Sequence, residues 1–233
     1  MNFAELLAQP GVEEVCELRS PFGFMAFHGG SLEAMTDVIA GAAAEASGAS
    51  YYGVHQPADL TWHIPSTKVD PAQSPALAAF LAHVEVVVTV HGYGRVGSWE
   101  ALLLGGRNRE LAVHLADHLQ RALPAYTMVT ELDAIPVELR GLHRSNPVNR
   151  PRAAGVQLEL PPRVRGSSPL WADWEGPGPT PHTLALIGAL ADAARSWAII
   201  PANQTIEPGQ ADPKGPAIQP GRADPVRPAR PGR

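Results

Sequence analysis

The sequence predicts a three-layer α/β fold in which a mostly parallel or mixed central sheet carries helices on both faces. Short runs of β-branched and apolar residues alternate along the chain with longer segments of helical periodicity, as in βαβ units. The strongest run, VEVVVTVH at 84–91, is apolar on both faces, which is typical of a strand inside a covered sheet. A chain of 233 residues, 45% of them hydrophobic, is long enough to bury such a core.

The first strand and helix are predicted near the N-terminus. The apolar run GFMAFH at 23–28 indicates a strand, and the segment 31–48 has helical spacing. Ser31 is suited to the N-cap of this helix and Gly48 to its C-terminal stop. Four apolar residues would share the buried face of the helix: Leu32, Met35, Val38 and Ile39.

The remaining elements follow in alternation. Further strands are predicted at 50–55, 84–91, 126–130 and 155–160. Further helices are predicted at 74–83, 108–123 and 180–198. Since ligands of parallel sheets bind at the carboxyl ends of the strands, the functional residues are expected there.

The composition changes at about Pro201. The segment 201–233 is rich in Pro, Gly and Ala and contains the near-duplicates PGQADP and PGRADP. Such a segment buries too little apolar area to offset its ordering entropy. We therefore expect residues 1–200 to form the folded domain and 201–233 a disordered tail, with a proline-rich ligand for a partner as the alternative.

Charge and cysteine content exclude several classes of protein. A net charge of −5 and a pI of about 6.0 argue against nucleic acid or an anionic membrane as a partner. The single cysteine, Cys16, excludes an internal disulfide and a cysteine-based zinc site. The N-terminal residues lack the pattern of a signal peptide, and no apolar run reaches the roughly 18 residues of a membrane span. We expect a cytoplasmic protein, and the sequence does not indicate its oligomeric state.

Polar side chains stand at the ends of three predicted strands. His28 ends the first and is followed by Glu33 in the first turn of the next helix; His91 ends the strongest strand, and Glu159 lies near the end of another. Two imidazoles, a carboxylate and a water are the ligand set of a hydrolytic zinc site, and a second carboxylate serves as its general base. Glycines after His28 and His91 would leave room for the ion and substrate. The alternative is an ordinary βα turn with polar residues.

The other histidines are expected to have no role in the site. His114 and His118 are spaced like a metal-binding pair on a helix, but both can simply face solvent. The same interpretation applies to His55, His63, His83, His143 and His182.

Five segments resemble, in order and spacing, the poly-γ-glutamate hydrolases, a phage and bacterial family with a zinc-carboxypeptidase-like α/β fold. They are FHGGSLE, VVVTVHGYGR, LLLGGRNREL, NPVNRPRAAGVQLELPP and a final VR, and the resemblance spans roughly residues 20–198. It implies that His28, Glu33 and His91 bind Zn²⁺ and that Glu159 is the catalytic base.

The resemblance also implies where the substrate binds. The segment with Asn146, Asn149 and Arg150 falls where such enzymes hold a substrate carboxylate, a group that an arginine fork binds well. Arg152 competes with Arg150 for this role, and Arg95 is a candidate for stabilising the oxyanion. Arginines cluster in 140–165, where they would give an acidic protein a local basic face for a polyanion.

The function expected is hydrolysis of γ-glutamyl amide bonds, in poly-γ-glutamate, by a zinc-activated water with Glu159 as general base. The first alternative is an N-acyl-glutamate deacylase or another carboxypeptidase-like amidohydrolase with a different acidic substrate. The second is a scaffold that only binds a ligand, with the proline-rich tail as its docking element.

Overall fold

The fold comes from a computed structural model, which describes residues 1–167 and 176–198. Residues Met1–Ile199 form one compact unit. The predicted disordered tail, 201–233, lies outside the described residues.

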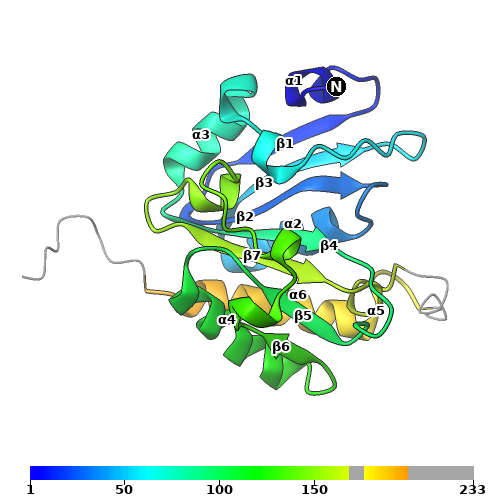
Figure 1. Cartoon of the computed structure of the whole chain (residues 1–233), viewed down its shortest axis with the longest axis vertical. Coiled ribbons are helices and arrows are strands. Elements are labelled where there is room, and N and C mark those ends of the chain that lie inside the picture. The colour runs from blue at the N-terminus through cyan, green and yellow to red at the C-terminus, as the bar shows by residue number, and fades with distance from the viewer. Residues whose placement is uncertain (168–175, 199–233) are drawn as a thin grey trace, which may run out of the picture. The chain divides into compact units, whose positions relative to one another are not determined.

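Seven strands form one mixed sheet in the order β1-β3-β2-β4-β7-β5-β6, which runs from top to bottom in Figure 1. The strands are β1 (Glu13–Glu17), β2 (Ser20–Gly30), β3 (Ala49–Gln56), β4 (Val86–Gly92), β5 (Ala101–Leu104), β6 (Thr127–Val129) and β7 (Gly155–Leu160). The neighbours β3, β2, β4 and β7 are parallel, whereas β1 and β5 are antiparallel to the strands beside them in this block. The predicted α/β class with a mostly parallel or mixed sheet is confirmed. The carboxyl ends of β2, β4 and β7 therefore lie next to one another.

Helices cover both faces of the sheet, as predicted. They are α1 (Phe3–Leu7), α2 (Thr36–Ser47), α3 (Pro75–His83), α4 (Arg109–Ala122), α5 (Pro162–Arg165) and α6 (Pro181–Ser196). Alternate residues of β2 point to opposite faces: Phe24 and Ala26 pack with α2, α4 and α6, and Met25 and Phe27 pack with α1 and α3. None of the helices in the described residues is long and apolar enough to cross a membrane.

Two strands of the sheet had no counterpart in the prediction. The edge strand β1 has the sequence EEVCE, and its exposed glutamates hide the alternation of a half-buried strand. Strand β5 has four residues and is too short to give a periodic signal.

The predicted helix at 31–48 begins later than expected, because residues 31–35 form a turn. The Glu33 N–H donates to the His28 carbonyl at 2.9 Å, and Met35 has a left-handed backbone with φ 73°. Helix α2 starts at Thr36, so Glu33 is not in its first turn. The Ser31 hydroxyl caps no helix and instead contacts the carbonyl oxygens of Pro57 and Leu60, at 2.7 and 2.6 Å. The predicted stop at Gly48 is confirmed by its φ of 72°.

The end of β2 depends on a glycine, which gives a first test of the fold. Gly30 has φ +71°, and a Cβ there would lie 2.2 Å from the Gln56 carbonyl oxygen of β3. We expect Gly30→Ala to lower the free energy of unfolding by more than about 2 kcal/mol in chemical denaturation. Gly188→Ala in α6 is the matched control, because a Cβ there has no neighbour within 4 Å. That variant should gain about 0.5–1 kcal/mol. Wild-type stability of Gly30→Ala would contradict the close packing of β2 on β3.

Candidate metal centre

Three neighbouring strands bring the predicted site residues together at the carboxyl edge of the sheet. His28 lies near the end of β2, His91 in β4 and Glu159 in β7, and His91 pairs directly with Glu159 in the parallel register. All three side chains are buried. Glu33, in the turn after β2, is half-buried beside the two histidines. Four residues separated by up to 131 positions thus form one cluster.

The Glu33 carboxylate is held between the two imidazoles. Its Oε1 lies 2.8 Å from His28 Nδ1, and its Oε2 lies 3.2 Å from His91 Nδ1. Oε2 also accepts a hydrogen bond of 2.8 Å from the Gly92 N–H. One potential ligand atom from each of His28, Glu33 and His91 lies within 4.8 Å of the others.

The donor set of this cluster fits a metal ion. His28 Nε2 lies 2.8 Å from the Ile64 carbonyl oxygen, to which it donates, and this leaves the Nδ1 lone pair directed at Glu33. A lone pair facing a carboxylate oxygen requires a cation between them, either a proton or a metal. His91 adds a buried ring nitrogen, Nε2, with no hydrogen-bond partner among the described residues. Two imidazoles and one carboxylate are ligands that zinc accepts.

The charges of the cluster favour a cation at this point. Burial by itself would raise the pKa of Glu33, but His91 and His28 outweigh it and hold that pKa well below its ordinary value. Burial by itself would lower the pKa of His91, but Glu33 and, more weakly, Glu159 raise it. These charges therefore keep Glu33 ionised between the two imidazoles, where a bound cation would balance its charge.

Glu159 stands beside the cluster and is held by a buried amide relay. Gln157 Nε2 donates to Glu159 Oε1 at 2.8 Å and to the Leu139 carbonyl at 3.2 Å. Asn146 Nδ2 in turn donates to Gln157 Oε1 at 2.7 Å. Burial raises the pKa of Glu159, helped by the Glu33 charge and opposed by His91 and Gln157. Gln157 was not predicted, although its position two residues before Glu159 places it on the same face of β7.

The cluster opens into a cavity of about 780 Å³. His28, Glu33, His91, Glu159 and Gln157 line it from the sheet edge, and the segments 65–67 and 137–143 line it from two loops. His63 and His143 also line it; both are exposed, in agreement with the surface positions predicted for them, but the sequence did not indicate that they lie beside the cluster. The His63 ring centroid lies 4.8 Å from that of His28. Both histidines are in loops, where no periodicity reveals their position.

The other histidines lie outside this cavity. His55 contacts the Tyr51 hydroxyl, His83 the Arg19 carbonyl and His182 the Tyr126 hydroxyl. His114 and His118 are half-buried rather than solvent-facing, and each has its Nε2 3.2 Å from the Ser196 hydroxyl of α6.

Of the residues predicted to bind substrate, Asn146 lines the cavity, whereas Asn149, Arg150, Arg152 and Arg95 do not. Asn149 uses its amide on the backbone: Nδ2 donates to the carbonyls of Gly141 and His143, and Oδ1 accepts from the Arg107 N–H. Arg150 lies 3.9 Å from Asp70. Arg152 pairs with Glu85 just before β4, at the opposite edge of the sheet from His91, and Arg95 pairs with Glu138. Their roles in substrate binding stay predictions.

A buried arginine, Arg165, connects the segments that carry the cluster. Its Nη1 donates to the Ala34 carbonyl at 2.6 Å and its Nε to the Leu160 carbonyl at 3.1 Å. A Cβ on Gly92 would lie 2.7 Å from its Cζ. Gly92 therefore makes room for Arg165, and a Cβ on Gly29 would clash with Asp37. The sequence indicated that these glycines leave space for the ion and substrate, whereas in the structure they leave space for neighbouring side chains.

The chain is similar to several solved structures, although no curated protein matches it. A bacteriophage poly-γ-glutamate hydrolase is 22% identical with a TM-score of 0.66, covering 81% of this chain and 91% of that one. A zinc-free apo structure of YNDL is 21% identical with a TM-score of 0.67, covering 84% and 96%. A Burkholderia mallei protein assigned as a carboxypeptidase is 12% identical with a TM-score of 0.48, covering 83% and 66%.

The family comparison covers most of the chain. The model of the family described as poly-gamma-glutamate hydrolase matches residues 1–168, which is more than half of the 233 residues. The chain belongs to the poly-γ-glutamate hydrolase family and is a hydrolase.

Proposed function

We propose that this chain hydrolyses the γ-glutamyl amide bonds of poly-γ-glutamate, with Zn²⁺ held by His28, Glu33 and His91. The observation that carries the proposal is the convergence of both Nδ1 atoms on one carboxylate, beside a second, buried carboxylate in the same cavity. Membership of the family supports the substrate, and the zinc-free apo form described for YNDL supports the choice of ion. We assign the activity to residues 1–200.

Individual residues of the chain would carry out separate steps of the hydrolysis. When bound, a zinc ion would acidify a water molecule and polarise the carbonyl group of the scissile amide. Glu159 takes a proton from the water as general base and then donates it to the leaving nitrogen. Its raised pKa suits a group that must hold a proton between these two transfers. Gln157 orients the carboxylate through the hydrogen bond to Oε1.

Arg140 is better placed than the predicted arginines to meet a substrate carboxylate in the cavity. Arg140 lines the cavity, and its Nε donates to the Ile135 carbonyl at 2.8 Å, which restrains the guanidinium. A guanidinium held in this way can bind a carboxylate with its remaining N–H groups.

The variant Glu159→Gln tests the catalytic role on poly-γ-glutamate. We expect kcat to fall by about 10²–10⁴-fold, since glutamine cannot transfer the proton, while zinc content stays that of the wild type. Glu138→Gln, which changes an exposed carboxylate at the same cavity, should keep kcat within a few-fold. A zinc-loaded Glu159→Gln enzyme with wild-type kcat would exclude Glu159 as the base. If the wild type cleaves N-acyl-glutamates or peptides but not poly-γ-glutamate, the proposed substrate is wrong.

The same variant has an expected effect on stability in the metal-free protein. Because burial raises the folded-state pKa of Glu159, its contribution to stability is full below the ordinary carboxyl pKa of about 4 and is lost as pH rises through the raised value. Glu159→Gln removes this loss, so its Tm in a chelator at pH 7 should exceed that of the wild type. The gain should shrink towards pH 4. A lower Tm at pH 7 would show that the ionised carboxylate stabilises the fold.

A further inference from the structure

A second, smaller cleft adjoins the cavity of the metal centre. It has a volume of about 280 Å³, and its lining includes Lys68, Asp70, Ser145 and Arg150. Thr67 lines both hollows, so they meet at this residue.

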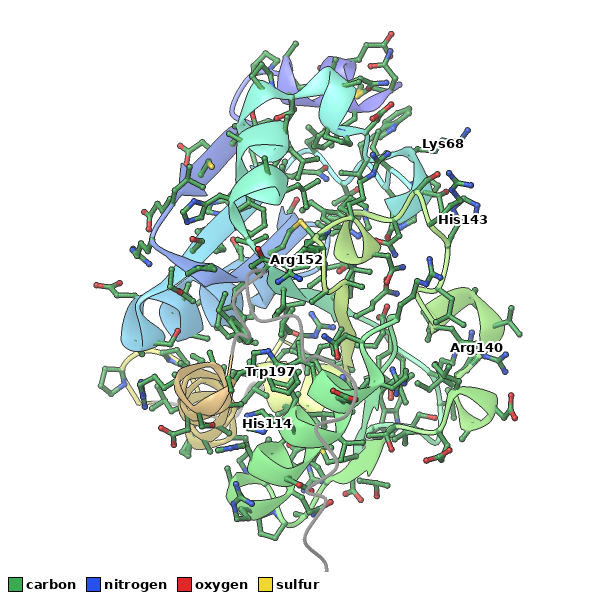
Figure 2. All side chains as sticks on the ribbon, turned by 90° about the vertical axis from the view of Figure 1, so that its left-hand side faces the viewer. Lys68, His114, Arg140, His143, Arg152 and Trp197 are labelled. Atoms are coloured by element: carbon green, nitrogen blue, oxygen red, sulfur yellow. The ribbon has the colours of Figure 1, made fainter. Side chains whose placement is uncertain are left out.

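The same two chain segments form the walls of both hollows. Residues 65–67 line the cavity and 67–70 the cleft; on the other side, His143 lines the cavity and Ser145 the cleft. The Ser145 N–H donates to His143 Nδ1 at 3.1 Å, which ties the second wall together at the junction. In Figure 2, Lys68, His143 and Arg140 project along the same edge of the view, whereas Arg152 lies apart from them. The two hollows therefore adjoin at Thr67 and share both wall segments.

The charge of the cleft suits a carboxylate. Lys68 and Arg150 supply two positive charges against one negative charge from Asp70. The Arg150–Asp70 pair is long, at 3.9 Å, and both side chains are exposed, so the pair is weak. Asp70 Oδ1 also accepts a hydrogen bond of 3.1 Å from the Ala72 N–H, which holds the carboxylate at the start of a short 3₁₀-helix. Lys68 and Arg150 both line this hollow, and an ammonium and a guanidinium side by side can bind an anionic oxygen group.

We propose that this cleft is an outer subsite that binds a substrate carboxylate one or more γ-glutamyl residues away from the scissile bond. The inference rests on the proposed function, because the ligand that would extend from the metal centre to the cleft is a polymer with repeated carboxylates. It also gives Arg150 a place in substrate binding, outside the catalytic cavity. The subsite favours long chains over short ones.

The double variant Lys68→Gln/Arg150→Gln tests the subsite. We expect its KM for long poly-γ-glutamate to rise about five- to tenfold with kcat unchanged, since two exposed charge pairs with the substrate are lost. Its KM for the shortest γ-glutamyl oligomer that the wild type cleaves should not change. Arg121→Gln, an exposed arginine in the last turn of α4 that lines neither hollow, is the matched control and should leave both KM values unchanged.

A variant expected to lower KM distinguishes an effect of charge from structural damage. Asp70→Asn keeps the oxygen that caps the 3₁₀-helix but removes the negative charge from the cleft, so KM for the long polymer should fall. The KM of the wild type for the polymer should rise with salt more steeply than that of the double variant.

Two results would overturn the subsite, and a third bears on the proposed function. The subsite is excluded if the double variant has the wild-type KM for the long polymer, or if its KM rises equally for long and short substrates. In either case, cleavage of the polymer by the wild type would still support the proposed function. If the wild type cleaves no γ-glutamyl polymer at all, it is the proposed function that fails, and the subsite with it.

Discussion

The contact of one carboxylate with two buried imidazoles organises this end of the molecule. Glu33 meets His28 and His91 through its two oxygens and takes the Gly92 N–H as a third partner. A half-buried carboxylate without such partners would be costly, because desolvation removes part of its hydration without replacement. The turn at 31–35 and the ends of β2 and β4 must therefore keep their relative positions for the charge to stay satisfied. A metal ion in the cluster would use the same three groups.

The fold supplies this arrangement through neighbouring parallel strands and two supports. The strands β2, β4 and β7 place His28, His91 and Glu159 at one edge, and the direct pairing of His91 with Glu159 sets the base beside the ligands. Arg165 ties the Glu33 turn to the end of β7, and Gln157 fixes the carboxylate of Glu159. The burial that raises the pKa of Glu159 also disfavours its ionised form. An ionised Glu159 therefore lowers the free energy of unfolding, a loss that is common for residues placed for catalysis.

The sequence was informative wherever a local pattern determines structure. The β-branched run at 84–91 predicted β4. The histidines at the strand ends predicted the cluster, because parallel strands bring their carboxyl ends to one edge of the sheet. The predicted start of α2 was wrong. Leu32 and Met35 have helical spacing in the sequence, but they belong to a turn before Thr36 in which Met35 has a left-handed backbone.

Long-range contacts of side chains that do not stand at strand ends could not be deduced from a single chain. The partners of Asn149 are backbone groups 6 to 42 residues away, and Glu85, the partner of Arg152, is 67 residues away. No spacing rule distinguishes these side chains from ones that meet substrate. The same holds for Arg165, whose guanidinium reaches the Ala34 carbonyl across 131 residues.

Titration of zinc into the metal-free chain tests the central claim, that His28, Glu33 and His91 form one metal site. Calorimetry should find one zinc ion bound per wild-type chain, with affinity reduced at least about 100-fold in His91→Ala and unchanged in His55→Ala, whose side chain lies outside the cavity. A wild-type chain that binds no zinc, or a His91→Ala chain that binds it equally well, would contradict the account.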